Sequence, residues 1–402
     1  MGRRRPAAPA DGATTSAPVE ARLESRAVGL LLITNDFPPR AGGIQQYCHH
    51  LVRRLPPGEV VVYAPAWPGA EEFDAGEPYR VVRHPTSRML PTGDLARRAV
   101  ELVREVRPEL ICFGAAFPLG LLARRLTRET GVPCMGFTHG VEVAVSGVPL
   151  VRRLMTRVAA DMRVLTAVSR WSAARVERGA RGRCPIELLP SGVDADLYHP
   201  GVDGAAVRAR HGLGADPVCV CVSRLVPRKG QDRLIQAWPR VVRQVPAARL
   251  LIVGPGPYER KLRRMAAASP VADRIHFSGE VRWEELPAHY AAGDVFAMPC
   301  RTRWLGMDLE ALGVVFLEAS ASGLPVVAGR SGGSPETVVE GVTGTVVDGR
   351  RAAEVGDAVA ALLADPARAR AMGEAGRRWV EAEFDWQAIV ARLEKLVVKA
   401  GR

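Results

Sequence analysis

Two cations lie close together in the segment SRLVPRKGQD, which directly follows the apolar run PVCVCV. Arg224 and Lys229 are five residues apart in this segment. An arginine can bind a phosphate through two parallel hydrogen bonds, and a lysine adds a compact positive charge. A solvated basic loop is the alternative, but the position directly after a buried strand favours a site for a phosphate group.

Two carboxylates follow in LEALGVVFLEASASGLPVVAG. Gly313 indicates a turn with a helix from about Val314, which leaves Glu310 in the preceding loop and places Glu318 two turns into the helix. The carboxylates could accept hydrogen bonds from hydroxyls of one extended ligand, while N–H groups at the helix start meet its phosphates. Two glutamates at this spacing are common by chance, and the small residues with GLPVVAG after them make the motif specific.

Two glycines precede an expected helix in NDFPPRAGGIQQY, after the first apolar run. Backbone N–H groups at such a turn, with the helix dipole behind them, favour a phosphate. Gly42 and Gly43 alone are equally consistent with an ordinary turn between a strand and a helix.

A histidine follows another apolar run in VPCMGFTHGVE. His139 would lie on a loop at the carboxyl end of a strand, where ligands bind in open α/β sheets. The competing interpretation is a histidine satisfied by local hydrogen bonds, which is the commoner case for a single histidine. A metal role is not indicated, because no partner stands near it at ligand spacing.

Two further patterns have ordinary explanations. Asp194-Ala-Asp196 matches a metal-binding motif, but it lies in a stretch rich in glycine and proline where aspartate favours turns, so we predict no metal site. LIVGPGPYE lacks the third glycine of a dinucleotide-binding fingerprint. We interpret Gly254 and Gly256 as a turn that comes close to a ligand.

All these motifs lie among short apolar runs that alternate with amphipathic stretches. The runs are AVGLLLITN, EVVVYAP, ELICFGA, VPCMGFT and MRVLTAVS in the first half, and PVCVCVSR, ARLLIVG, RIHFSG, DVFAMP and LPVVAG in the second. Apolar strands separated by helices are typical of parallel sheets covered on both faces. The two series predict an α/β protein with two doubly wound, Rossmann-like domains that face each other across a cleft.

The domain limits follow from composition and from helix signals. We expect a disordered extension over residues 1–26, an N-terminal domain over 27–198 and a C-terminal domain over 199–380. The boundary falls in SGVDADLYHPGVDG, which is rich in glycine, proline and aspartate. A final amphipathic helix over 381–402 could cross back to the N-terminal domain.

The composition restricts the partners and the compartment. The chain has 402 residues and a formal net charge of +12, with the excess spread over both halves. This charge suits nucleic acid, phosphorylated metabolites or an acidic membrane face. Seven scattered cysteines favour a reducing cytoplasm. We expect no membrane-spanning segment, because no run of about 18 apolar residues occurs.

In their order along the chain, the four motifs resemble those of retaining nucleotide-sugar glycosyltransferases of family 4, which have the GT-B fold. The resemblance covers roughly residues 27–400. LLITNDFPPRAGGIQ, LPSGVDADLYHP and MPCRTRWLGMDLEALG carry a closer likeness to the GDP-mannose-dependent phosphatidylinositol mannosyltransferases of that family. The resemblance implies transfer of mannose from GDP-mannose to a phosphatidylinositol mannoside lipid, by an enzyme held peripherally at the inner face of the plasma membrane.

The resemblance also implies where each substrate binds. The C-terminal domain would bind the donor and the N-terminal domain the acceptor. The residues implied at the donor are Gly43, Arg224, Lys229, Gly254, Glu310, Gly313, Val314, Val315 and Glu318. Those implied in catalysis are His139, Arg224, Lys229 and Glu310, and those implied beside the acceptor are Gln45 and His139.

Individual roles follow from the same resemblance. Arg224 and Lys229 would hold the diphosphate, Glu310 the mannose hydroxyls and Glu318 the ribose. Gly43 would lie near the β-phosphate. Glycosyl transfer builds negative charge on the leaving diphosphate, so with no metal or other cofactor expected, protein cations must stabilise it.

Three positions depart from the subgroup pattern. Val141 stands where a second histidine is frequent, and Ala311 replaces the usual glycine after the first glutamate. Pro257 follows a turn where a basic residue is common. None of the three removes the two cations.

A basic amphipathic segment, VPLVRRLMTRVAADMRV, lies in the expected acceptor domain. It combines Leu150, Leu154 and Met155 with Arg152, Arg153, Arg157 and Arg163. Such a helix suits an anionic membrane surface. A helix that packs its apolar side on the domain is the alternative, and both hold if the arginines face the bilayer.

Two other functions are weighed against mannosyl transfer. One keeps the fold and changes the substrates, for example UDP-glucose with another acceptor of the cell envelope. The other is a basic nucleic-acid-binding protein. Two observations argue against a nucleic-acid-binding protein. The basic residues of this chain follow strand ends, and aromatic residues make up only 5% of the chain. We therefore expect no nucleic-acid partner.

Activity is expected to survive treatment with EDTA, because no credible cluster of metal ligands stands in the sequence. The measurement is sugar transfer before and after chelation. Loss of turnover on chelation, with recovery on adding a divalent ion, would show that the mechanism needs a metal.

Overall fold

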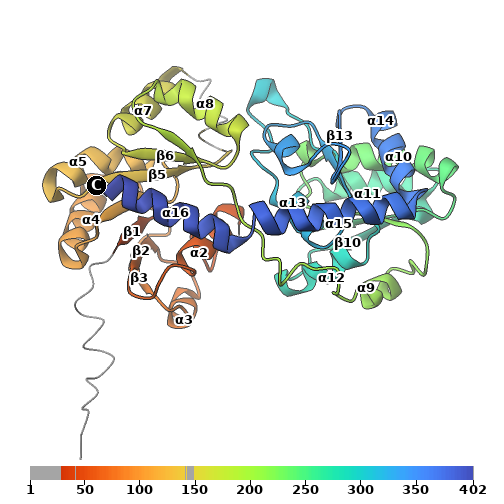
Figure 1. Cartoon of the computed structure of the whole chain (residues 1–402), viewed down its shortest axis with the longest axis horizontal. Helices are drawn as coiled ribbons and strands as arrows, with labels where there is room; N and C mark the ends of the chain where they lie inside the picture. Colours follow the sequence, from red (N-terminus) through yellow and green to blue (C-terminus); the bar gives the residue numbers. More distant parts are fainter. Residues whose placement is uncertain (1–28, 41, 141, 143–148, 402) are drawn as a thin grey trace, which may run out of the picture.

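A computed structural model describes residues 29–40, 42–140, 142 and 149–401 of the chain. Two parallel β-sheets lie side by side along its long axis, and helices cover both of them (Figure 1). The extension expected over residues 1–26 and the departure at Val141 fall outside the described residues. The α/β architecture with two Rossmann-like sheets is confirmed.

Over the described residues, the first sheet has seven parallel strands in the order β3-β2-β1-β4-β5-β6-β7. Its strands are β1 (Leu30–Ile33), β2 (Val60–Pro65), β3 (Arg80–His84), β4 (Leu110–Phe113), β5 (Cys134–Thr138), β6 (Val164–Ala167) and β7 (Ile186–Leu188). The central strand β1 reads LLLI and is wholly buried, because helices cover both faces of the sheet.

The helices of the first domain divide between the two faces of this sheet. They are α2 (Gly43–Val52), α3 (Ala70–Ala75), α4 (Gly93–Val106), the short η1 (Leu119–Leu122), α5 (Ala123–Thr130), α7 (Pro149–Ala160) and α8 (Arg170–Ala180). Leu31 and Ile33 of β1 share a core with α4, α5, α7 and α8. Leu30 and Leu32 point to the opposite face and pack with α2.

In the described part of the chain, the second sheet has six parallel strands in the order β10-β9-β8-β11-β12-β13. They are β8 (Val218–Val222), β9 (Arg249–Val253), β10 (Ile275–Gly279), β11 (Val295–Met298), β12 (Val326–Gly329) and β13 (Gly344–Val347). The surrounding helices are α9 (Ala205–Arg210), α10 (Gln231–Gln244), α11 (Glu259–Ala267), α12 (Leu286–Ala291), α13 (Val314–Ala321), α14 (Ala352–Leu363) and α15 (Pro366–Glu383). The short turns η2 (Pro227–Lys229), η3 (Ala272–Arg274), η4 (Trp283–Glu285), η5 (Trp304–Gly306) and η6 (Ser334–Thr337) connect them.

The chain crosses between the two domains at two places that lie side by side. The first crossing follows β7, and the second joins α15 to α16 (Trp386–Gly401). The N–H of Val193 on the first crossing donates to the carbonyl of Phe384 on the second at 2.9 Å. Figure 1 shows α16 running from the second domain back over the first. Its buried residues Ile389 and Leu393 join the core that contains Leu30 and Leu32.

Every apolar run identified in the sequence contains a strand, but β3, β7 and β13 were not predicted. All three lie at sheet edges. An edge strand has a neighbour on one side only, so its sequence can be short or polar. β3 reads RVVRH and is mostly half-exposed, and β7 has only three residues.

Replacing Leu393 with alanine should lower the free energy of unfolding by about 2–5 kcal/mol, because this α16 side chain is 0% exposed within the first domain's core. The matched control is Val398→Ala on the same helix, where the side chain is 53% exposed and the change should stay within about 0.5 kcal/mol. Urea unfolding measures both. Equal effects of the two changes would mean that α16 does not belong to that core.

Candidate active site

A buried ion pair lies at the carboxyl ends of two neighbouring strands of the second sheet. Lys229 follows β8 and Glu310 follows β11, and Lys229 Nζ lies 2.7 Å from Glu310 Oε2. Both residues are buried. The nearby Arg228 adds to the positive charge, with Nε 3.8 Å from the same carboxylate oxygen and Nη1 3.6 Å from Asp308. The structure therefore brings the predicted cation and the first predicted carboxylate together.

Arg224 lies on the same loop as Lys229 but is exposed. Within the described ranges, no ion pair is found for its guanidinium. Its loop is fixed by the neighbouring turn, since Leu225 N–H donates to the Pro255 carbonyl at 2.8 Å and Tyr258 N–H donates to the Leu225 carbonyl at 3.1 Å. An unpaired cation on a fixed backbone is suited to an incoming anion.

Gly254 is required by this same packing. Its φ is +120°, and a Cβ atom there would lie 2.4 Å from the carbonyl oxygen of Ser223. Gly256 is equally close to the backbone of Leu225, so the close approach expected at these two glycines is to the Arg224 loop itself. Gly254 thus shapes the site by letting that loop come near.

The turn predicted at Gly313 opens α13 at Val314, as the sequence indicates. Gly313 has a φ of +95°, and a Cβ atom there would lie 2.6 Å from the Phe316 ring. The first turn of a helix leaves N–H groups without partners in the helix, so Val314 and Val315 present free donors. Glu318 is the fifth helical residue and lies one turn into α13, so the expected two turns were wrong.

Glu318 is a buried carboxyl group held by a tyrosine. Tyr290 Oη donates to Glu318 Oε2 at 2.5 Å. Burial raises the pKa of Glu318 to about 7, against the opposing effects of Tyr290 and of the positive charge on Lys229. The group is therefore close to half ionised near neutral pH.

Both domains line a cavity of about 420 Å³, which we call the interdomain pocket. Gly43, at the start of α2, lies on one side, and Val314, Val315 and Glu318 lie on the other. The pocket has an aromatic part made by Tyr47, Tyr198, Trp283 and Trp386. The sequence analysis missed these aromatic residues, because they come from four separate segments of the chain. The only signal that could have pointed to them is that aromatic residues are scarce in this chain.

His139 directly follows β5 and lies behind the residues that line the interdomain pocket, without lining that pocket itself. It is buried, and its Nε2 lies 2.9 Å from the Gly114 carbonyl, which makes Nε2 the donor. Its ring packs edge-on against Tyr47 of the interdomain pocket, with 5.1 Å between ring centroids. Its backbone N–H donates to Glu142 at 3.0 Å. The ring is thus partly satisfied by local hydrogen bonding and also contacts a residue that lines the interdomain pocket.

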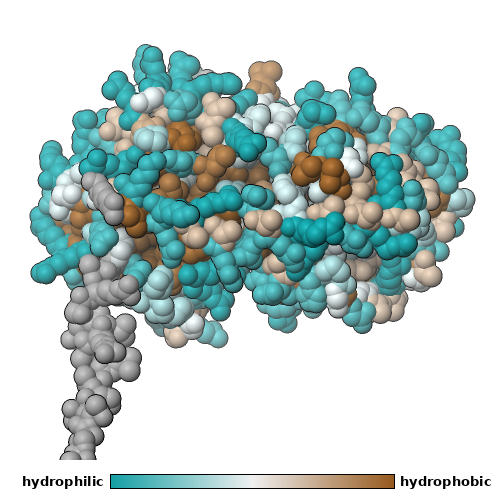
Figure 2. Space-filling model, in the orientation of Figure 1, coloured by the Kyte–Doolittle hydropathy of each residue, from teal (hydrophilic) through white to brown (hydrophobic). Residues whose placement is uncertain are grey.

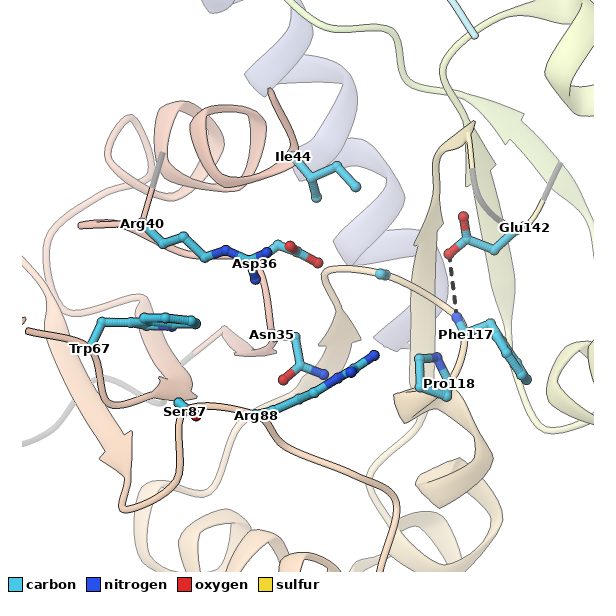
Figure 3. A pocket seen from close by; sticks show the side chains of 11 residues that line it. Asn35, Asp36, Arg40, Ile44, Trp67, Ser87, Arg88, Phe117, Pro118 and Glu142 are labelled. Carbon is cyan, nitrogen blue, oxygen red and sulfur yellow. Dashed lines mark hydrogen bonds between the residues drawn. The ribbon is translucent and has the colours of Figure 1, made fainter. Parts of the chain in front are cut away.

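A second cavity, of about 510 Å³, lies wholly in the first domain and is called here the N-domain pocket. Figure 3 shows Arg40 and Arg88 reaching toward it from two different loops, with Asn35 and Asp36 between them. Burial raises the pKa of Asp36, while Arg40 and His139 act in the opposite direction. Acidic, basic and amide groups therefore converge on one hollow.

Gln45 supports this pocket from behind. Its Nε2 donates to Asp36 Oδ1 at 2.8 Å, and Gln45 does not itself line the cavity. Glu142 closes the opposite side and accepts from the backbone N–H of Phe117 at 3.4 Å (Figure 3). The sequence reasoning missed Asp36 and Arg40, although both lie in the NDFPPRAGG motif, because only its glycines were considered.

Direct contacts join the two domains across the cleft. A Cβ atom at Gly140, next to His139, would lie 3.8 Å from Ala311 Cβ, next to Glu310. Ser169 Oγ donates to the Ala311 carbonyl at 2.8 Å. Glu336 of the second domain accepts from the first two N–H groups of α8, those of Arg170 and Trp171, each at 2.8 Å. The loops that carry His139 and Glu310 therefore lie against each other across the cleft.

Asp194 of the Asp194-Ala-Asp196 pattern behaves as the turn interpretation predicts. Asp194 accepts from the N–H of Leu197 at 3.0 Å and pairs with Arg54 at 3.2 Å. Among the described residues, no group of three or more His, Cys, Asp or Glu side chains is arranged to hold a metal ion. All seven cysteines are free and buried.

Comparison with known proteins identifies the family. Residues 41–197 match the family model described as Glycosyltransferase Family 4, and residues 205–379 match the model described as Glycosyl transferases group 1. A Mycolicibacterium smegmatis protein named GDP-mannose-dependent alpha-(1-6)-phosphatidylinositol monomannoside mannosyltransferase is 51% identical over 92% of this chain and 98% of its own. The chain belongs to glycosyltransferase family 4. This family 4 chain is also 42% identical, over the same shares, to a Corynebacterium glutamicum protein named as the monoacylated phosphatidylinositol monomannoside mannosyltransferase.

Solved structures agree with the GT-B fold of this family 4 chain. Anabaena HepE in complex with UDP superimposes with a TM-score of 0.80 over 92% of this chain and 99% of that one, at 19% identity. Such low identity supports the fold alone.

The raised pKa of Glu318 predicts a pH-dependent stability. The folded state binds a proton at Glu318 up to about pH 7, whereas an unfolded glutamate releases it near 4.5, so this group makes stability fall between those values as pH rises. Glu318→Gln should therefore gain melting temperature relative to the original chain as pH goes from 5 to 8. Glu374→Gln, at an exposed position, is the control. A constant difference across this range would contradict the raised pKa.

Proposed function

We propose that this chain transfers mannose from GDP-mannose to a phosphatidylinositol mannoside lipid, with retention of the α configuration. The relatives that are 51% and 42% identical carry names for this reaction, and the similarity extends over nearly the whole chain. The observation that carries the proposal is the buried Lys229–Glu310 pair, beside an unpaired Arg224, close to the pocket that both domains share.

The donor would lie along the second domain's side of the interdomain pocket. Arg224 and Lys229 bind its diphosphate, and the free N–H groups of Val314 and Val315 with Gly43 opposite them bind the phosphate oxygens. Glu318 accepts from the ribose hydroxyls in its ionised form. The aromatic part of the pocket offers flat apolar surface for a nucleobase.

The charge that develops on the leaving diphosphate explains the roles proposed for Lys229 and Glu310. As the bond from the sugar to the diphosphate breaks, negative charge grows on the leaving group, and the two cations stabilise it. Lys229 has three N–H donors, so it can keep Glu310 while it also binds a phosphate oxygen. Glu310 is then held where it can accept from mannose hydroxyls. We propose that this stabilisation needs no metal ion or other cofactor.

The acceptor would enter from the first domain. The N-domain pocket offers Arg40 and Arg88 for a phosphate and Asp36 for sugar or inositol hydroxyls. Gln45 holds Asp36 in place, so its role at the acceptor is indirect. His139 lies between this pocket and the interdomain pocket, since it touches Tyr47 on one side and Glu142 on the other. That position is appropriate for a group beside the reacting sugar.

The lipid acceptor also requires contact with a membrane surface. Among the described residues, no helix combines the length and apolar character needed to cross a bilayer. Met155 and Val158 of α7 are buried in the first domain, while Arg152, Arg153 and Arg157 are exposed. We propose that this arginine face meets the anionic inner face of the plasma membrane.

A donor screen tests the proposed reaction. Labelled GDP-mannose, UDP-glucose and UDP-N-acetylglucosamine are each incubated with the enzyme and vesicles that contain phosphatidylinositol monomannoside. We expect label to enter the lipid from GDP-mannose alone, with one mannose added in α linkage. Transfer from a UDP-sugar instead would favour the alternative donor, and a lipid left unlabelled by all three would exclude the proposal.

Arg224→Ala and Lys229→Ala should each weaken GDP binding, because a charge-assisted contact to a phosphate contributes about 1.5–3 kcal/mol. This corresponds to a loss of affinity of roughly tenfold to a hundredfold. Calorimetric titration with GDP measures it. The control is Arg178→Ala on α8, a basic residue that is exposed outside the cleft. GDP affinity that is unchanged in both cleft variants would refute this diphosphate site.

A further inference from the structure

The loop between β11 and α13 exposes three large apolar side chains. Trp304 is 66% exposed, Leu305 is fully exposed and Met307 is 50% exposed. Trp304 and Leu305 have φ values of +49° and +54°, a backbone conformation that is unfavourable for residues other than glycine. We call the segment Trp304–Met307 the tip of this loop. Its apolar side chains are exposed, and two of its residues have an unfavourable backbone conformation. Because packing within the protein does not explain this arrangement, we expect the tip to have a function.

Hydrogen bonds and an ion pair between Arg303 and Asp308 close the base of this loop. Arg303 N–H donates to the Asp308 carbonyl at 2.8 Å, and the side chains of these two residues pair at 3.4 Å. The N–H of Gly306 donates back to the Arg303 carbonyl at 3.0 Å. These bonds tie the backbone into a small loop, at the end of which the apolar side chains are exposed.

The tip lies beside α8, which packs against the arginine-bearing helix α7. A Cβ atom at Gly306 would lie 3.1 Å from Nη2 of Arg175 on α8. Thr156 of α7 donates to the Gly179 carbonyl of α8 at 2.6 Å. Both helices follow strands of one parallel sheet and so run in the same direction. Arg152 precedes Thr156 by about one turn of α7, and Arg175 precedes Gly179 by about one turn of α8. Arg152 and Arg175 therefore lie at the same height along the two helices.

Helix α7 carries further exposed apolar and basic side chains. Leu150, at the start of α7, is 66% exposed. Arg152, Arg153 and Arg157 are exposed, and the described part of the chain provides no acidic partner for their side chains. Figure 2 shows hydrophobic surface at the top of the molecule between the domains, next to hydrophilic groups over α7 and α8. Apolar and positive groups side by side match the boundary of an anionic bilayer.

We propose that the tip formed by Trp304–Met307 inserts into the lipid surface, while the arginines of α7 bind the anionic head groups. The proposal rests on the proposed function in one respect: insertion would bring the cleft to a lipid acceptor. Glu310 follows the tip by three residues, so insertion would also anchor the carboxylate at the donor. The second domain thus contributes its own membrane contact.

Vesicle binding of Leu305→Asn tests the insertion directly. Asparagine tolerates the left-handed backbone of Leu305, and the fully exposed side chain is not needed for folding. The control, Val342→Asn, removes an apolar side chain that is 52% exposed elsewhere on the second domain. The vesicles contain phosphatidylcholine with phosphatidylinositol, and co-sedimentation is measured at low salt and at about 0.5 M salt, where charge attraction is screened.

We expect Leu305→Asn to bind vesicles about tenfold more weakly than the original chain at both salt concentrations, because the loss is apolar. The double variant Arg153→Glu, Arg157→Glu should lose binding mainly at low salt. Val342→Asn should bind like the original chain. Equal binding by Leu305→Asn and the original chain at both salt concentrations would overturn the proposal.

A second comparison separates membrane insertion from a role in covering the substrate. Mannosyl transfer is measured with the acceptor in vesicles and with its deacylated, water-soluble form. Leu305→Asn should slow only the vesicle reaction. Equal slowing with both acceptors would assign the tip to the substrate and refute insertion. If neither acceptor is used by the original chain, the proposed function fails, and the vesicle-binding comparison still decides the role of the tip.

Discussion

The candidate active site depends on one buried ion pair, between Lys229 and Glu310. An unpaired ammonium group at this depth would cost several kcal/mol, so the carboxylate is what allows a cation to remain at the floor of the cleft before any ligand arrives. The pair also joins the loops after β8 and β11, which are neighbouring strands of the second sheet. With these loops fixed, Arg224 on one side and the start of α13 on the other are placed around a single space.

The first domain reaches that space through contacts that are equally specific. Ser169 binds the carbonyl next to Glu310, and the Glu336 carboxylate binds the first two N–H groups of α8, where the helix dipole favours a negative charge. The two chain crossings run side by side at Val193 and Phe384. The chain path and these side chains therefore hold the loop of His139 against the loop of Glu310, which suits a reaction that needs groups from both domains.

The central strands, and the loops that carry Lys229 and Glu310 at strand ends, could be predicted from the sequence because each is a local signal. A run such as VCVCV can only be buried, and a glycine before an apolar helix indicates a turn, as at Gly313. β3 and β7 could not be predicted, because edge strands lack a continuous apolar pattern. The aromatic wall of the interdomain pocket joins Tyr47, Trp283 and Trp386 from distant segments, and Gln45 acts through Asp36. Such relations arise only from tertiary packing.

The most direct test of this account is an experimental structure of the chain with GDP bound. The account predicts the diphosphate between Arg224 and Lys229, with its oxygens facing the N–H groups of Val314 and Val315. It also predicts the ribose hydroxyls at Glu318, and Lys229 still in contact with Glu310. A diphosphate bound away from both cations, or bound through a metal ion held by acidic side chains, would contradict it.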